Sequence, residues 1–279
     1  MAYTNPLTEE YTQLYSKIRN LINDEQIYPS IDTEEFKKFV SKNWAGVPSF
    51  AITLREMKSS DKGHISLRIY PNYVQADLFF NGVRGVKRFI NFLHPSSKKE
   101  FKEFVEAANN LSNSYTIELQ QAEKWGNAPT IWGNPIEKIG CNNLTALELE
   151  DFIQKVKKRM EDRDERQKLL PKGRKITVSV AVGRTKLNKL NELKDEEIKP
   201  VFENLSKLIR ITHYLKSDRE IKRQIKREKK LTDFHNERDK LNNKGADLTE
   251  KEKNRLKKIE EKINELKEEQ EHPTEHQRK

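Results

Sequence analysis

Three consecutive segments of alternating apolar and polar residues constrain the fold of this chain most strongly. They read SFAITLREM, HISLRIY and YVQADLFFN (residues 49–57, 64–70 and 73–81), and the last two are separated only by Pro71-Asn72. Alternation with a period of two places the apolar side chains on one face of a strand, and short polar turns join antiparallel neighbours. The sequence therefore predicts an antiparallel meander of three strands.

Further strands and helices are expected around this meander. Two more strands are predicted at residues 114–119 and 175–182, the second ended by Gly183. Helices are predicted where apolar residues recur every three or four positions, which occurs at 7–23, 33–43, 84–93, 98–111 and 197–215, and in a helix that starts at Thr145 and has its apolar stripe up to Met160. Residues 124–143 lack any period and are expected to form a long ordered loop. The result is an α+β domain over residues 1–216, with an antiparallel sheet of about five strands and packed helices.

The remaining C-terminal residues are predicted to form an antiparallel helical hairpin over 217–270. Spacings typical of a capping box start its two helices at Ser217 with Glu220 and at Thr249 with Glu252. Apolar residues in the last helix follow steps of three and four, the pattern of a short coiled coil; they are Leu256, Ile259, Ile263 and Leu266. Residues 271–279 are expected to be a disordered tail.

The charge balance favours an anionic partner. The 279 residues carry a formal net charge of +10 and a pI near 9.4, which suits nucleic acid, an anionic membrane surface or an acidic protein. Cys141 is the single cysteine, so we expect a half-buried structural thiol in a cytoplasmic protein rather than a disulfide or a cysteine-based zinc site. No run of about eighteen apolar residues is present, so no association with a membrane is predicted.

One basic stripe lies in the predicted hairpin. On a helix its members share an arc of roughly 140°; they are Arg219, Lys222, Arg223, Lys226, Arg227 and Lys230. The stripe could follow a phosphate backbone, or it could pair with the acidic end of the last helix, where Glu265, Glu268, Glu269, Glu271 and Glu275 would lie beside it. We favour internal pairing, because residues 217–279 have a net charge of only +3, which leaves +7 on residues 1–216.

The densest basic cluster of the globular part lies at residues 155–175, with ten basic and four acidic residues. It runs from a helix into the loop before the fifth strand. The residues expected to hold phosphates are Lys155, Lys158, Arg159, Arg166, Lys172, Arg174 and Lys175. The alternative is a solvated face whose charges pair locally.

Exposed aromatic rings would add base stacking to these phosphate contacts. Trp125 and Trp132 in the expected loop, and Trp44, are candidates for stacking or, alternatively, anchors of the core. Trp44 belongs to the segment NWAGVPSFAI (residues 43–52). This segment, followed by a strand meander, resembles the N-terminal recognition domain of modification-dependent restriction systems of the McrB type. The resemblance covers only this segment, and the functional prediction does not rest on it.

The sequence contains no motif that predicts a nucleotide, a metal or another cofactor. His272 and His276 stand four residues apart, but Pro273 lies between them, so a metal site is not predicted there. A metal-dependent nuclease would need Asp77 and Glu118 to converge in one cleft. The lysine usually found two positions after the glutamate is absent.

We therefore predict a non-catalytic nucleic-acid-binding protein, with DNA or RNA as its partner, in which the 155–175 cluster contacts phosphates. The stripe at 219–230 is a secondary basic face. Two alternatives remain. One is an interaction or scaffold protein whose hairpin docks a partner or self-associates, favoured if Leu256 and Ile263 stay uncovered. The other is the metal-dependent nuclease.

Overall fold

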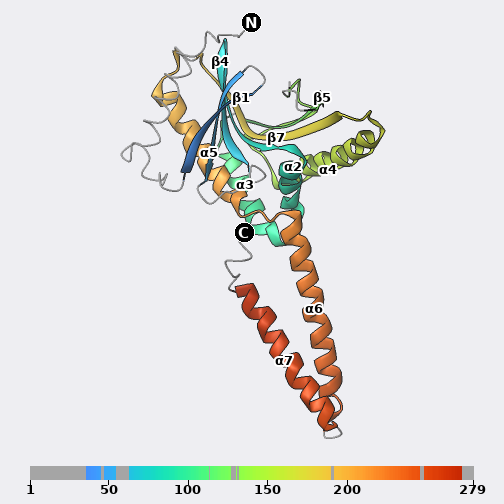
Figure 1. Cartoon of the computed structure of the whole chain (residues 1–279). Coiled ribbons are helices and arrows are strands. Elements are labelled where there is room, and N and C mark those ends of the chain that lie inside the picture. Colours follow the sequence, from blue (N-terminus) through green and yellow to red (C-terminus); the bar gives the residue numbers. More distant parts are fainter. Residues whose placement is uncertain are drawn as a thin grey trace. The chain divides into compact units, whose positions relative to one another are not determined.

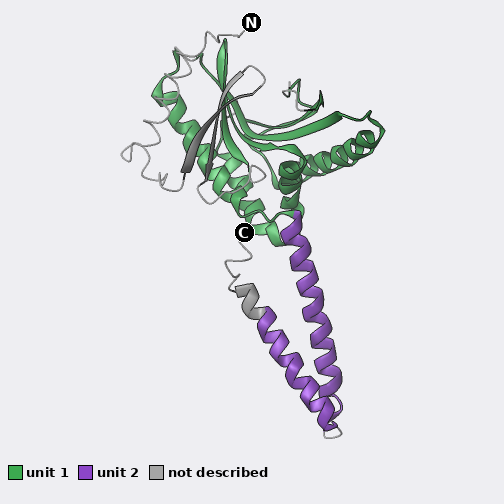
Figure 2. Ribbon diagram, in the orientation of Figure 1, with its two compact units in different colours: residues 1–217 green, residues 218–279 purple. Residues whose placement is uncertain are grey.

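The protein divides into two compact units, residues 1–217 and 218–279 (Figures 1 and 2). The structure is a computed structural model that describes residues 36–44, 47–54, 63–112, 114–126, 130, 132–189, 192–245 and 248–271. Within these ranges, side chains are described from residue 63 to residue 266. The helix predicted at 7–23 and the tail predicted at 271–279, except for the backbone of Glu271, lie outside the described residues.

An antiparallel sheet of seven strands forms the centre of the first unit. The strand order is β1-β2-β3-β4-β7-β5-β6, and every neighbouring pair is antiparallel. The strands are β1 (Phe36–Trp44), β2 (Val47–Leu54), β3 (His64–Tyr70), β4 (Tyr73–Asn81), β5 (Thr116–Trp125), β6 (Glu137–Gly140) and β7 (Arg174–Leu187). The predicted α+β class is confirmed, and β1 and β6 are additional to the five strands expected.

Four α-helices of the first unit cover one face of this sheet (Figure 1). They are α2 (Gly82–Ile90), α3 (Lys98–Asn109), α4 (Ala146–Leu169) and α5 (Asp195–His213), with short 3₁₀ turns η2 (Asn91–Leu93) and η3 (Pro95–Ser97). The core lies between the layers, where alternate strand residues such as Leu67, Leu78 and Val180 meet Phe89 and Phe152 from the helices. Period-two strands facing amphipathic helices produce this arrangement.

Two predictions near the ends of the sheet were wrong. The helix predicted at 33–43 is strand β1, which pairs with β2 through a register irregularity between Lys37 and Val40. Such an irregularity breaks the period of two, so the apolar spacing resembled that of a helix. The predicted loop 124–143 contains the four-residue edge strand β6, which is too short to show a period of its own.

A bulge in β7 decides which side chains reach the open face of the sheet, the face that the helices do not cover. Gly183, predicted to end the strand, has φ +60° and lies within it, and β7 continues to Leu187. Leu78 pairs with Val182 and Ala76 with Thr185, so two residues of β7 oppose Asp77 alone. An extra residue reverses the alternation. Arg184 therefore points to the open face.

The second unit is formed by α6 (Asp218–Asn242) and α7 (Glu250–Glu271), which pack against each other. Leu241, Ile259 and Ile263 are buried between them, and Phe234 and Leu256 pack against this cluster. The predicted capping box of α7 is confirmed, because Thr249 Oγ1 accepts from the Glu252 N–H (3.3 Å) and the Glu252 carboxylate accepts from the Thr249 N–H (3.0 Å). No helix in the described ranges is long and apolar enough to span a bilayer.

Candidate nucleic-acid interface

Helix α4, the turn after it and the start of β7 carry the seven residues predicted to hold phosphates. A capping box fixes the start of α4, since Thr145 Oγ1 accepts from the Glu148 N–H (3.2 Å) and the Glu148 carboxylate accepts from the Thr145 N–H (2.9 Å). Leu149, Phe152 and Val156 then bury one face of the helix. Its remaining faces are exposed, including the side chains of Lys155 and Lys158.

The three predicted arginines already have carboxylate partners on the neighbouring strands. Arg159 Nε donates to Glu137 of β6 at 2.8 Å, and Arg166 Nη2 donates to Glu123 of β5 at 2.8 Å. Arg174 Nη1 lies 3.9 Å from the same Glu123 carboxylate. These arginines thus agree with the alternative of local pairing. Each such exposed ion pair contributes at most about 1 kcal/mol to the free energy of unfolding.

The four predicted lysines differ from the arginines. Lys155, Lys158, Lys172 and Lys175 are exposed, and none forms an ion pair with another described residue. Lys175 is directly opposite Lys124 in the β5–β7 ladder, so two ammonium groups share one face of the sheet. Like charges directly opposite each other in a sheet are destabilising. An anion bound between them would relieve this repulsion.

An aromatic side chain lies at the same end of the two strands. Trp125 ends β5 directly opposite Arg174 of β7, and 56% of its surface is exposed. The Arg174 guanidinium carbon lies 5.1 Å from the centroid of the ring, a distance typical of a cation–π contact. Successive residues of a strand point to opposite faces, so the Trp125 ring lies on the face covered by the helices, whereas Lys124 and Lys175 lie on the open face. The β5–β7 tip, defined as Lys124, Trp125, Lys172, Arg174 and Lys175, therefore carries an accessible ring on one face and two lysines on the other, with Lys172 in the turn.

Sequence reasoning placed Lys172, Arg174 and Lys175 in the interface but missed Lys124. About thirty residues separate Lys124 from the start of the basic cluster in sequence, and only the strand pairing brings it to Lys175. Trp132, the other loop tryptophan, packs edge-on against Phe79, with centroids 5.9 Å apart. Trp132 is therefore partly covered by a contact outside the core between sheet and helices, whereas Trp125 is the exposed ring. Trp44 lies in β1, whose side chains are outside the described set.

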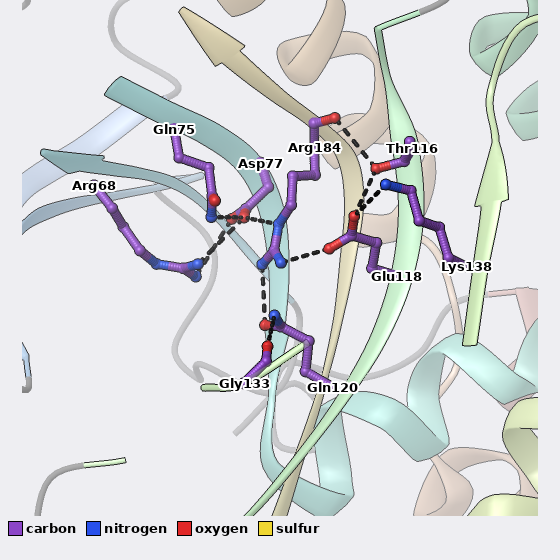
Figure 3. Close-up of polar contacts among 9 residues, drawn as sticks. All are labelled: Arg68, Gln75, Asp77, Thr116, Glu118, Gln120, Gly133, Lys138 and Arg184. Carbon is purple, nitrogen blue, oxygen red and sulfur yellow. Dashed lines mark hydrogen bonds and ion pairs between the residues drawn. The ribbon is translucent and has the colours of Figure 1, made fainter. Parts of the chain in front are cut away.

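A second polar cluster occupies the open face of the sheet around Arg184 (Figure 3). Arg184 Nε donates to Asp77 at 2.9 Å and Nη1 donates to Glu118 at 2.6 Å, while Nη2 donates to Gln120 at 3.1 Å. Asp77 is 1% and Glu118 6% exposed. Further cations approach from outside: Arg68 lies 3.4 Å from Asp77 and Lys138 lies 3.3 Å from Glu118.

This cluster brings together the two acids of the nuclease alternative. Asp77 and Glu118 lie on opposite sides of the Arg184 guanidinium (Figure 3), so their negative charges are directed at a cation of the chain itself. Among the described residues, no group of three or more His, Cys, Asp or Glu side chains is placed to hold a metal ion. The donors fit an internal ion-pair network better than a metal site.

The partly buried His64 of β3 and the buried Cys141 have shifted pKa values. Burial, with a smaller contribution from the charge of Arg68, lowers the pKa of His64 to about 4, so the ring is neutral near pH 7. Cys141 is fully buried, and not half-buried as predicted, and burial raises the pKa of its thiol to about 12. A neutral buried thiol is a poor nucleophile, which agrees with a structural role.

The basic stripe of α6 stays a prediction in both of its interpretations. Glu268, Glu269, Glu271 and Glu275 lie beyond the side chains that the structure describes. The hairpin itself buries Ile263 and packs Leu256 against the same cluster. Leu256 and Ile263 are therefore covered within the hairpin, and their exposure, which would have favoured a docking hairpin, is not observed.

Comparisons with protein-family models, with curated proteins and with solved structures found no match to this chain.

Proposed function

We propose that this protein binds nucleic acid non-catalytically through the β5–β7 tip and the adjacent face of α4. The observation that carries the proposal is the cross-strand pair of Lys124 and Lys175 beside the exposed Lys172. Two ammonium groups directly opposite each other repel, and this repulsion lowers the stability of the fold. A phosphate bound between them would replace the repulsion by attraction.

The exposed lysines of α4 add a second basic surface on the helix-covered side of the sheet, opposite to the side of Lys124 and Lys175. Lys155 and Lys158 stand one turn apart, and at 1.5 Å per residue Lys158 lies about 16 Å from the end of α4 at Leu169. Several phosphates of one backbone fit within such a length. Contacts of this kind give affinity that depends on salt and not on sequence.

The test is a salt series of binding to labelled duplex DNA, single-stranded DNA and RNA. The triple variant K124A/K172A/K175A removes the tip lysines, and K98A/K99A/K102A is the matched control, since these three lysines are exposed on α3. Each neutralised phosphate adds about 0.9 to the slope of log affinity against log salt, so the tip variant should lower the slope by roughly two to three.

Two results would contradict the proposal. One is the lack of binding to any of the three probes at low salt. The other is an equal fall in slope for both triple variants, because that would indicate net charge and not a located surface.

A further inference from the structure

The exposed ring of Trp125 has no role in the core, although it is one of the largest side chains of the chain. It is 56% exposed at the end of β5. Burying an aromatic side chain is among the most favourable contributions to folding, and Trp125 forgoes much of this contribution. Its neighbour on the same face, Glu123, pairs with Arg166 of α4, so the strand is covered up to that position and the ring lies beyond it.

The turn between α4 and β7 holds this ring in position. The Gly126 N–H donates to the Gly173 carbonyl oxygen at 2.7 Å, which closes the tip. Gly173 has φ +95°, and a methyl group added to it would lie 3.8 Å from the Trp125 ring. Together with Arg174 near the ring, these contacts support part of its surface and leave the rest accessible. An aromatic platform that is fixed before binding loses little entropy when a partner arrives.

We infer that the tip binds single-stranded nucleic acid, with an unpaired base stacked on Trp125 and an adjacent phosphate held by Lys172 in the turn, while Lys124 and Lys175 attract further phosphates from the open face. This inference rests on the proposed function and names its substrate class. In a duplex the faces of the bases are stacked on one another, so they are not available to a ring on the protein surface. Unpaired bases present a free face, and every base can stack.

Phosphate binding and base stacking are assigned to different residues of the tip. The lysines act on phosphates, which duplexes and single strands both carry, whereas Trp125 acts only on bases. The single-strand preference therefore depends on Trp125 alone. Arg174 has its charge shared with Glu123 and lies near the ring, so it supports the platform.

The experiment compares the wild-type protein with W125A and W125F, using labelled oligothymidylate and a duplex of the same length at one salt concentration. Stacking on an aromatic side chain changes affinity by about 5- to 150-fold for one base. We expect W125A to lose affinity for the single strand within this range, W125F to retain most of it, and both to bind the duplex as the wild type does. W132F is the matched control, and a thermal melt of each variant establishes that it is folded.

A second readout follows the ring directly. With W44F/W132F, Trp125 is the remaining tryptophan, and stacking of a base should quench its fluorescence on addition of oligothymidylate but not of duplex. Equal affinity of W125A and wild type for the single strand, or equal losses for both probes, would overturn the inference. The lysine variant separates the two proposals: if it loses duplex binding while W125A changes nothing, the tip binds phosphates without stacking a base.

Discussion

Replacing Arg184 by methionine tests the importance of the buried network on the open face. The substitution removes three hydrogen bonds, to Asp77, Glu118 and Gln120, from a residue that is 8% exposed. Methionine keeps much of the volume but leaves two buried carboxylates without their main cation. Arg68 is 3.4 Å from Asp77, and Lys138, 3.3 Å from Glu118, is itself half exposed, so neither is equivalent to Arg184.

Removing one partner of a buried ion pair lowers the free energy of unfolding by about 3–5 kcal/mol. For a unit of this size, each kcal/mol lowers Tm by about 2–4 °C, so R184M should lower it by roughly 6–20 °C. Thermal and urea denaturation at pH 7, followed by circular dichroism, measure the change. R166M is the control, because Arg166 has one exposed carboxylate partner and should change the free energy of unfolding by at most about 1 kcal/mol.

The triple variant D77N/E118Q/R184M sharpens this test, since it removes the unpaired charges together with the arginine. It should recover part of the stability lost in R184M. A loss below about 1 kcal/mol in R184M, or a triple variant less stable than R184M, would refute the view that Arg184 compensates the two acids.

Three further predictions concern single residues. G183A should be less stable than G82A, because both glycines have positive φ but only at Gly183 would the added methyl lie 3.1 Å from Leu205; urea denaturation should show roughly 1–3 kcal/mol between them. The pKa of His64 is lowered from 6.5 to about 4, so the contribution of its neutral ring to the free energy of unfolding is complete above pH 6.5. This contribution is lost as the pH falls toward 4, by at most about 1.4 kcal/mol per pH unit. H64Q should flatten the pH dependence of Tm in this window, and an unchanged profile would contradict the assignment. Hydrogen bonds from Lys244 and Thr249 lower the pKa of Glu252 to about 2, so its contribution is present above pH 4.5 and lost between pH 4.5 and 2. E252Q should reduce the fall in helical ellipticity over that range, and equal titrations of both proteins would count against it.

The meander and the core helices were predictable because their patterns are local. Leu67 and Ala76 each lie between two polar neighbours, and the capping boxes of α4 and α7 are short sequence signals. The Arg184 network was not predictable as a unit. Asp77 and Glu118 were considered together, but the arginine between them depends on a bulge, and Gly183 seemed to end the strand. A bulge adds one residue without any sequence signal beyond a glycine that also suits a turn.

In the candidate interface, too, some residues could be predicted from the local sequence and others only from the pairing of the strands. Lys172, Arg174 and Lys175 were predicted because they lie close together in the sequence. Lys124 required the register of β5 against β7, which no local pattern contains. Trp125 was identified as a candidate for stacking, but its exposure depends on where the strand ends relative to α4, and this is a property of packing.

The network and the tip lie on one continuous stretch of ladder, and this links the stability of the fold to the geometry of the interface. From Glu118 opposite Ala181 to Trp125 opposite Arg174, β5 and β7 pair without irregularity, a distance of about 23 Å at 3.3 Å per residue. A slip by one residue would move every side chain of one strand to the other face. Arg184, which joins Glu118 and Gln120 of β5 to Asp77 of β4, opposes such a slip at one end. At the other end, the same register places Lys124 against Lys175 and Trp125 against Arg174. The buried charges thus hold in place the pairing on which the proposed binding surface depends, although they lie too far from it to contact the same ligand group.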